Sequence, residues 1–236
     1  MTMGLLGGMP VAPILGVDFV VETAVTSEGE KVPAARYTTL FVRERVYDTL
    51  ESSTDQATIF DFDQEAIWIC DQSQRSKTKL AFDELVRLES EASRRALRMS
   101  PLVQFTAAPE FAGRSWDPPT KILRLTHDVL AYEAELDTQI EPEIAARFRA
   151  FADWSARLNT LSPGLPPRAR LELNREIAIR EAVPHRIQCR RQTAAGQFET
   201  VTANHQFRRD LRPTDIELLD KCQQWFEDFE ERAWGG

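Results

Sequence analysis

The sequence predicts an α+β fold: a curved antiparallel β-sheet, a meander or half-barrel, with helices packed on one face. Ala57 to Leu80 holds three short runs of β-branched and aromatic residues, which are separated by tight polar turns. Later stretches repeat their apolar residues at helical spacing. Connections this short join antiparallel neighbours, because parallel strands need a crossover of about a dozen residues or more. Most nucleotide-binding layouts are therefore excluded for this part of the chain.

Strands are expected to fill the first part of the chain. Val17 to Val25 forms the first strand, and the polar turn at Ser27–Glu30 follows it. Ala35 to Leu50 continues in strand-like composition, but the parity of its apolar residues changes near Arg43, so we expect a hairpin there. The meander adds three strands, which are expected at Ala57–Phe62, Ala66–Cys70 and Ser76–Leu80.

Helical periodicity begins after the meander. Phe82 to Met99 carries a one-sided apolar stripe, with acidic residues early and arginines late, as the helix dipole favours. Ser100-Pro101 ends this helix. The segments that follow are expected to be a short β-like stretch, a loop and a hairpin turning at His127-Asp128: Leu102–Phe111, Ala112–Thr120 and Lys121–Leu136.

The second half of the chain is expected to start with two helices. Glu141 to Leu158 is the first, with Pro142 in its first turn, where a missing N–H costs little. The apolar residues of Arg168 to Ala182 fit the period of a strand as well as that of a helix. We favour a helix because Glu, Arg, Leu and Ala dominate this segment. A last hairpin is expected from His185–Gln192 and Gln197–Arg208.

A C-terminal helix is predicted from Thr214 onwards. The pattern Thr214-x-x-Glu217 is a capping box, and Pro213 precedes it. The apolar residues of this helix lie on one face, which is expected to cover the sheet. Residues 1–16 are expected to be a flexible tail, and residues 17–236 a single α+β domain.

Composition and charge limit the function. The chain has 29 basic and 37 acidic residues, and a net charge of −8 repels phosphate backbones, so nucleic acid is excluded as a partner. No segment approaches the ~20 apolar residues of a membrane-spanning helix. The start lacks a basic residue before its apolar run, which Pro10 and Pro13 interrupt, so a cytoplasmic location is favoured and the periplasm is the alternative.

The cysteines are expected to be buried free thiols. Cys70, Cys189 and Cys222 are widely spaced and have no ligand spacing for zinc. A Cys70–Cys189 bridge is the alternative if the protein is exported.

No catalytic motif is complete in this sequence. Asp61-Phe62-Asp63 after four apolar residues resembles a phosphatase nucleophile motif, but a further strand follows it, so turn-forming acids are the better interpretation. His127, His185 and His205 show no metal-ligand pairing and are expected to make ordinary hydrogen bonds. No G-x-S-x-G elbow, P-loop or dinucleotide glycine motif is present, so we expect no cofactor and favour a non-enzymatic role.

Arginine pairs and aromatic residues are the remaining candidates. The pairs either form a basic patch that holds an anion or make ordinary ion pairs, and we favour ion pairs: Arg94-Arg95, Arg190-Arg191 and Arg208-Arg209. Trp234 stands near the end of the chain beyond the last helix, so it is expected to be exposed or to dock on a partner.

Three segments resemble LolA-like half-barrel proteins, which include periplasmic lipoprotein carriers: Leu40–Tyr47, Ala57–Phe62 and Ile67–Thr78. The resemblance covers Ala35 to Leu97. It implies a curved antiparallel sheet wrapped around helices, with an apolar hollow able to hold an acyl chain. The chain departs from the exported carriers in its helical insertion, Glu141 to Ala182, and no carrier residue is specific enough to be transferred.

The favoured function is a non-enzymatic binding module of LolA-like type, which holds an apolar, lipid-like ligand or a protein partner on the sheet. Phe41, Phe60 and Trp68 are the candidate ligand-binding residues. The alternative is a structural or interaction subunit of a larger assembly, which uses the N-terminal tail and the C-terminal helix, with Trp234 as the partner-binding residue. A hydrolase whose residues the sequence does not identify is a third hypothesis.

Overall fold

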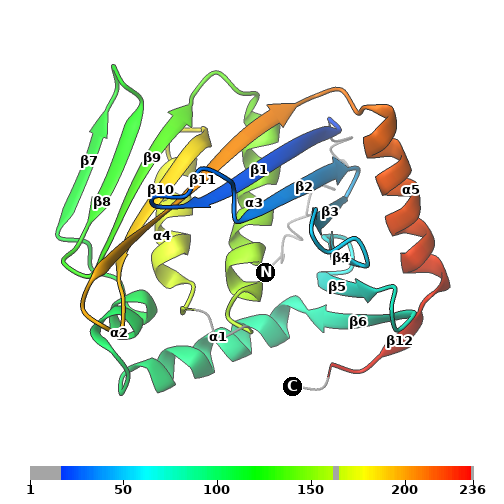
Figure 1. The fold of residues 1–236 in the computed structure, drawn as a ribbon, viewed down its shortest axis with the longest axis horizontal. Helices are drawn as coiled ribbons and strands as arrows, with labels where there is room; N and C mark the ends of the chain where they lie inside the picture. The colour runs from blue at the N-terminus through cyan, green and yellow to red at the C-terminus, as the bar shows by residue number, and fades with distance from the viewer. Residues whose placement is uncertain (1–16, 162–164, 235–236) are drawn as a thin grey trace, which may run out of the picture.

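A computed structural model describes residues 17–161 and 165–234, so the expected tail at residues 1–16 lies outside it. Strands of the described residues form one open sheet of twelve strands, in the order β12-β6-β5-β4-β3-β2-β1-β11-β10-β9-β8-β7 (Figure 1). The strands are β1 (Phe19–Ser27), β2 (Ala35–Val42), β3 (Arg45–Leu50), β4 (Gln56–Asp61), β5 (Ala66–Asp71), β6 (Ser76–Ala81), β7 (Gly113–Asp117), β8 (Ile122–Thr126), β9 (Leu130–Asp137), β10 (Val183–Gln192), β11 (Phe198–Arg208) and β12 (Glu230–Arg232). The helices are α1 (Phe82–Ala96), α2 (Pro101–Ala107), α3 (Pro142–Leu158), α4 (Arg168–Ala178) and α5 (Pro213–Asp228).

The first strand joins two meanders. β1 pairs with β2 on one side and with β11 on the other, so it lies near the middle of the sheet (Figure 1). Neighbouring strands are antiparallel, except that β12 runs parallel to β6. The predicted α+β class with a curved antiparallel sheet is therefore confirmed.

Tight turns set the register of the first meander, as the sequence predicts. The Asp61 Oδ1 atom accepts the Gln64 N–H at 3.0 Å, and the Asp71 Oδ1 atom accepts the Gln74 N–H at 3.2 Å. The residue before the next strand then takes a positive φ, 47° at Glu65 and 46° at Arg75. Such turns are typical of hairpins, so the acids of the Asp61-Phe62-Asp63 motif act in a turn.

Helices α1 to α4 pack on one face of the sheet, called the inner face here, and α5 packs on the other, the outer face. Alternate residues of the same strands divide between the two faces, as in Phe41 inward and Leu40 outward. The inner core includes Phe19, Phe41 and Phe60 from the sheet and Phe148 from α3. The expected gathering of helices on one face therefore holds for four helices, and α5 covers the outer face of β2 to β5 instead.

The outer core places two cysteines together beneath α5. Cys70 of β5 and Cys222 of α5 are both buried there, and Trp68 packs edge-on against Phe226 at 5.3 Å between ring centroids. Burial raises the pKa of Cys70 to about 11 and that of Cys222 to about 12. Cys189 belongs to the inner core beside β9, and all three thiols are free, so the alternative Cys70–Cys189 bridge is wrong.

The N-cap of helix α5 lies two residues before the predicted cap, Thr214. Its N-cap is Arg212, whose backbone N–H donates to the Asp215 carboxylate at 2.7 Å. The same buried carboxylate accepts from Arg208 of β11 at 3.0 Å, and Arg208 also pairs with Glu22 of β1. Asp215, rather than Glu217, therefore closes the capping motif and ties α5 to the sheet.

Two segments between α1 and β8 differ from their predictions. Leu102–Phe111 was expected to be β-like, but Pro101 starts the helix α2, and Phe105 packs against Phe111 at 5.1 Å between ring centroids. The expected loop at Ala112–Thr120 contains strand β7, where a Cβ atom at Gly113 would collide with the Thr126 side chain of β8. A side chain at position 113 would therefore require the Thr126 hydroxyl to move.

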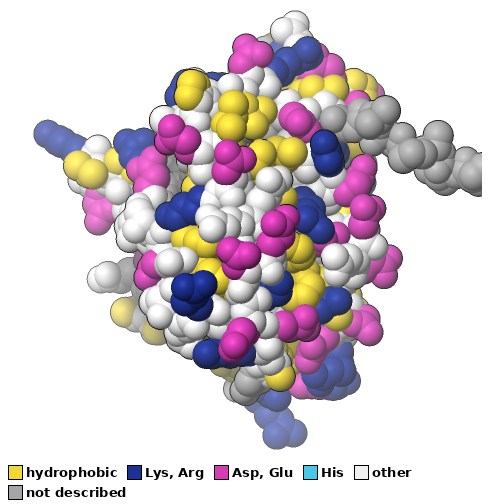
Figure 2. Space-filling model, turned by 90° about the vertical axis from the view of Figure 1, so that its right-hand side faces the viewer, with side chains coloured by type: hydrophobic (Ala, Val, Ile, Leu, Met, Phe, Trp, Pro, Cys, Tyr) yellow, Lys and Arg dark blue, Asp and Glu magenta, His cyan; other side chains and the backbone are white. Residues whose placement is uncertain are grey.

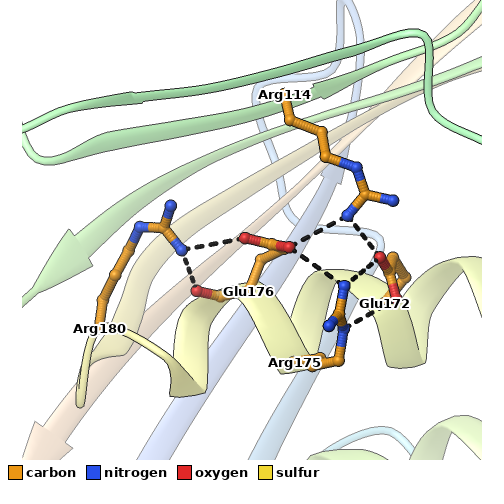
Figure 3. A network of polar contacts seen from close by, with 5 residues as sticks. All are labelled: Arg114, Glu172, Arg175, Glu176 and Arg180. Carbon is orange, nitrogen blue, oxygen red and sulfur yellow. Dashed lines mark hydrogen bonds and ion pairs between the residues drawn. The ribbon is translucent and has the colours of Figure 1, made fainter.

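A network of charged residues joins the edge strand β7 to α4 (Figure 3). Arg114 of β7 donates to Glu172 at 2.5 Å and to Glu176 at 3.0 Å. Arg175 of α4 pairs with both carboxylates, and Arg180, just after α4, pairs with Glu176. The network therefore fixes the inner side of β7 against α4.

Candidate functional site

A cavity of about 420 Å³ lies between the inner face of the sheet and helix α3. Its floor comes from β1 to β4 and β11, and its roof from α3 with Arg170 of α4. The lining residues are Thr23, Val25, Tyr37, Thr39, Asp48, Thr58, Phe60, Phe148, Phe151, Ala152, Ser155, Ala156, Leu158, Asn159, Arg170 and His205. Small-molecule sites in proteins have volumes of about 300–1,000 Å³, so this cavity is large enough for a ligand.

A wider hollow of about 590 Å³ lies over α3 and α4 on their far side. Three of its charged residues have partners in the protein: Asp153 accepts from Asn174 at 2.8 Å, Arg157 donates to Glu89 at 3.1 Å, and Arg149 pairs with Asp153. The cavity under α3 differs because some of its polar groups are unsatisfied. It is therefore the candidate site.

Sheet register places the polar floor residues in two adjacent rows. In one row, His205, Thr23 and Tyr37 lie opposite one another on β11, β1 and β2. In the other row, Thr39, Asp48 and Thr58 lie opposite one another on β2, β3 and β4. Each row stands beside buried aromatic residues of the same face, so the floor combines polar groups with an apolar wall.

Among the described residues that line this cavity, Asp48 is the one carboxylate. The Thr39 hydroxyl donates to its Oδ1 atom at 2.7 Å, and no cation of the described residues pairs with it. Part of the Asp48 side chain contacts the cavity, but protein atoms surround the carboxylate. This burial raises the pKa of Asp48 to about 6, although the hydrogen bond from Thr39 acts in the opposite direction. Burial, and then the charge of Asp48, also raises the pKa of the neighbouring Tyr37.

His205 presents an unsatisfied nitrogen at the cavity. Its Nδ1 atom shares a hydrogen bond of 2.9 Å with the Thr23 hydroxyl. Its Nε2 atom is buried, and within residues 17–161 and 165–234 it has no hydrogen-bond partner. Burial first, and then the positive charge of Arg170, lower the pKa of His205 to about 3, so the ring is neutral at pH 7.

Arg170 brings the one cationic side chain among the lining residues. Its Nε atom donates to the Asn174 side chain at 3.0 Å, and no carboxylate in the described part of the chain lies within ion-pair distance of it. The guanidinium is half-buried, and such groups in proteins are usually paired. An anion inside the cavity would supply the missing partner.

Aromatic rings of α3 form most of the apolar wall. Phe151 packs edge-on against Phe60 at 5.1 Å and against Phe41 at 5.5 Å between ring centroids. Phe148 lies 5.8 Å from the His205 ring. The cavity is therefore hydrophobic along α3 and polar at the β11 and β3 sides of its floor.

The predicted ligand-binding residues lie in three different places. Phe60 lines the cavity. Phe41 stacks on Phe19 at 4.0 Å and supports Phe151 from below without lining the cavity. Trp68 lies on the outer face under α5, and Trp234 packs, half-buried, against the inner core.

The three histidines have separate surroundings. His127 stacks on Phe105 at 4.0 Å, and His185 lies 3.7 Å from the Asp137 carboxylate on the surface. Across the residues with described positions, no group of three His, Cys, Asp or Glu side chains is arranged to hold a metal ion. Helices in the same part of the chain are all too short or too polar to cross a membrane.

The arginine pairs make ordinary contacts, as the sequence analysis favoured. Arg95 pairs with Glu91, Arg191 with Glu199 and Arg208 with Glu22. Figure 2 shows the side of the molecule that carries α5, where acidic and basic side chains are interspersed and neither sign forms a continuous patch. This side therefore offers no basic surface for a phosphate backbone.

No protein-family model matches this chain, and no curated protein matches its sequence. Among solved structures, a LolA superfamily protein from Nitrosomonas europaea is similar. The similarity covers 84% of this chain and 88% of that chain, with 11% sequence identity and a TM-score of 0.34. The function proposed below is therefore argued from the cavity residues.

Proposed function

We propose that this protein is a binding module that holds an apolar small molecule in the cavity between α3 and the inner face. The observation that supports the proposal most directly is the cavity of about 420 Å³, with aromatic and aliphatic side chains along one wall and a few polar groups on its floor. This composition is typical of ligand sites, where apolar walls supply affinity and few polar groups supply orientation. Phe60 is the predicted ligand-binding residue that this proposal retains.

An apolar chain gains affinity by leaving water. Each buried methylene group contributes about 0.8 kcal/mol, so a chain of about ten carbons gains about 8 kcal/mol. Association costs at least about 4 kcal/mol, which leaves a dissociation constant of about 1 mM for the chain alone. A tighter ligand therefore needs a polar group that bonds to the floor. The acyl-chain binding implied by the LolA-like sequence pattern would use the same cavity.

A blocked cavity tests this proposal. Ser155 lines the cavity from α3, whereas Ala146 is exposed on the same helix, over the far hollow. Ser155→Phe should fill the cavity and weaken the binding of the neutral fluorophore N-phenyl-1-naphthylamine at least tenfold. Ala146→Phe adds the same ring outside the cavity and should leave the binding unchanged. Fluorescence titration measures both.

Equal binding by the wild type and Ser155→Phe would contradict the proposal, provided that circular dichroism shows both proteins to be folded. The fluorophore carries no charge, so this experiment tests the apolar cavity independently of its polar floor.

The sequence hypothesis of a partner-docking Trp234 stays a second proposal. Trp234 follows the edge strand β12 and is only half-buried, so part of its ring is available at the surface. Trp234→Ala should release a bound partner, and native mass spectrometry of protein purified from its own host would detect the loss.

A further inference from the structure

We propose that the ligand of this cavity is an amphipathic carboxylic acid, whose carboxylate binds Arg170 and the His205 Nε2 atom while its apolar chain lies along α3. This inference rests on the proposed function and adds the chemistry of the ligand's polar end. Three features of the cavity carry it: a cation without an anion, a buried nitrogen without a partner, and the place of Asp48 across the sheet.

Arg170 and His205 both line the cavity. Arg170 comes from α4 above the floor, and His205 comes from β11 within the floor. After burial, the charge of Arg170 also contributes to the lowered pKa of His205. The proposal places one small anionic group in contact with both side chains.

Both groups lack a partner that a carboxylate would supply. Within the described residues Arg170 binds the neutral Asn174 amide and no carboxylate, although a guanidinium forms its strongest bonds with carboxylates. The His205 Nε2 atom has no hydrogen-bond partner in the residues that the structure describes, although buried polar atoms in proteins are nearly always bonded. A carboxylate has two oxygens, so it can satisfy both groups at once.

The hydrogen bond to Thr23 is compatible with a donor at Nε2. When the Thr23 hydroxyl donates to Nδ1, the neutral ring carries its proton on Nε2. That N–H is then a donor without a partner among the described residues. We assign this tautomer to the ligand-bound protein.

Asp48 lies too far from His205 to repel a carboxylate that binds Arg170 and His205. It lies on β3, and β2 and β1 separate β3 from β11 in the sheet. Three strand spacings amount to about 14 Å, so the carboxylate of the ligand would be far from Asp48 and in contact with Arg170. Asp48 also has a hydrogen-bond donor already in Thr39, whereas the His205 Nε2 atom has no partner in the described chain.

Three ligands of equal chain length distinguish the possible polar groups: dodecanoate, dodecanol and dodecylamine. Each is titrated against the protein loaded with N-phenyl-1-naphthylamine, at pH 7.5 and below its micelle concentration. Dodecanoate should displace the fluorophore at a concentration at least tenfold lower than dodecanol, and dodecylamine should be the weakest.

Arg170→Gln should remove this preference, so that dodecanoate binds no better than dodecanol. Arg170→Lys keeps the charge and should restore part of the preference. Arg175→Gln is the matched control, because Arg175 lies on the same helix and pairs with Glu172 on the surface. It should retain the full preference. His205→Phe removes the Nε2 donor and should weaken dodecanoate binding without weakening dodecanol binding.

The outcomes separate this inference from the proposed function. Equal affinity of the wild type for acid and alcohol would overturn the inference and leave the apolar cavity supported. Tightest binding of dodecylamine would also overturn it and point to Asp48 as the polar contact. If neither the fluorophore nor any of the three ligands bound, the proposed function would fail together with the inference.

Discussion

Asp48 shows how a single buried carboxylate links the cavity to stability. Its raised pKa means that the folded protein binds this proton more tightly than the unfolded chain does. The ionised form therefore destabilises the fold. This cost is absent below about pH 4, which is the ordinary pKa of aspartate. It grows as the pH rises towards 6 and is complete above the pKa of Asp48 in the folded protein.

Replacing Asp48 by asparagine should therefore stabilise the protein at neutral pH. The amide oxygen of the new side chain would still accept the Thr39 hydrogen bond, but the amide cannot ionise. The expected gain in the free energy of unfolding is on the order of 2 kcal/mol at pH 7.5, and it should be much smaller at pH 4. Urea unfolding of the wild type and Asp48→Asn at both pH values measures the difference.

A difference between the two proteins that did not change with pH would show that Asp48 titrates normally. In that case the gain would come from the amide itself rather than from the removed charge.

The cavity residues could be predicted only in part from the sequence. Phe60 was predicted as a ligand contact and His205 was considered as a metal ligand, whereas Asp48 and Arg170 were not considered. The signal was present on the strands: Thr39, Asp48 and Thr58 each stand two residues from a buried apolar residue of the same inward parity. Whether these side chains and Arg170 line one cavity depends on the register between strands and on the position of α4. No local sequence pattern contains this information.

At the scale of elements, the start of α5 depends on Asp215. Its carboxylate caps the helix through the Arg212 N–H and binds the Arg208 side chain of β11. Asp215→Ala should lower the free energy of unfolding by about 2–3 kcal/mol, because it removes a cap and leaves a charged donor with fewer partners.

Glu217→Ala is the matched control, since the sequence pattern placed the cap at this exposed residue. It should change the stability by no more than about 0.5 kcal/mol. Thermal unfolding of both variants decides between the two caps. A larger loss of stability from Glu217→Ala than from Asp215→Ala would contradict the cap at Asp215.

Most elements follow from local patterns, and the exceptions depend on long-range contacts. The meander, the helices α1 and α3 and the last hairpin lie where the periodicity of their apolar residues predicts them. Helix α2 was missed because Leu102 to Phe111 is too short to show a helical period, and its stability comes from packing against α4. Strand β7 was missed because Gly113, its first residue, and the prolines after it are typical of a loop.

At the scale of the whole molecule, the two halves of the sheet are covered differently. Strands β2 to β5 are buried on both faces, by α3 inside and α5 outside. Strands β8 to β10 are buried on the inner face only, and their outer face carries ion pairs such as Arg124–Glu133 and Arg186–Glu135. Stability is therefore expected to differ between the halves.

Hydrogen exchange should reveal this difference. Backbone amides of β3 and β4 should exchange most slowly, at rates set by global unfolding, and those of the edge strand β7 should exchange fastest among the strands. Exchange mass spectrometry with peptide resolution measures both. Equal protection of β3 and β7 would show that the sheet opens as one cooperative unit.

The two margins of the sheet differ in what they offer to another chain. Strand β12 is only three residues long and consists of Glu230, Glu231 and Arg232, so its free side is a short charged margin that disfavours further pairing. Strand β7 at the opposite margin has five residues and one unpaired side. If two copies paired through β7, the edge of each β7 strand would be hydrogen-bonded to the other copy. Self-association through the sheet would therefore stop at a dimer and would not propagate into a fibre.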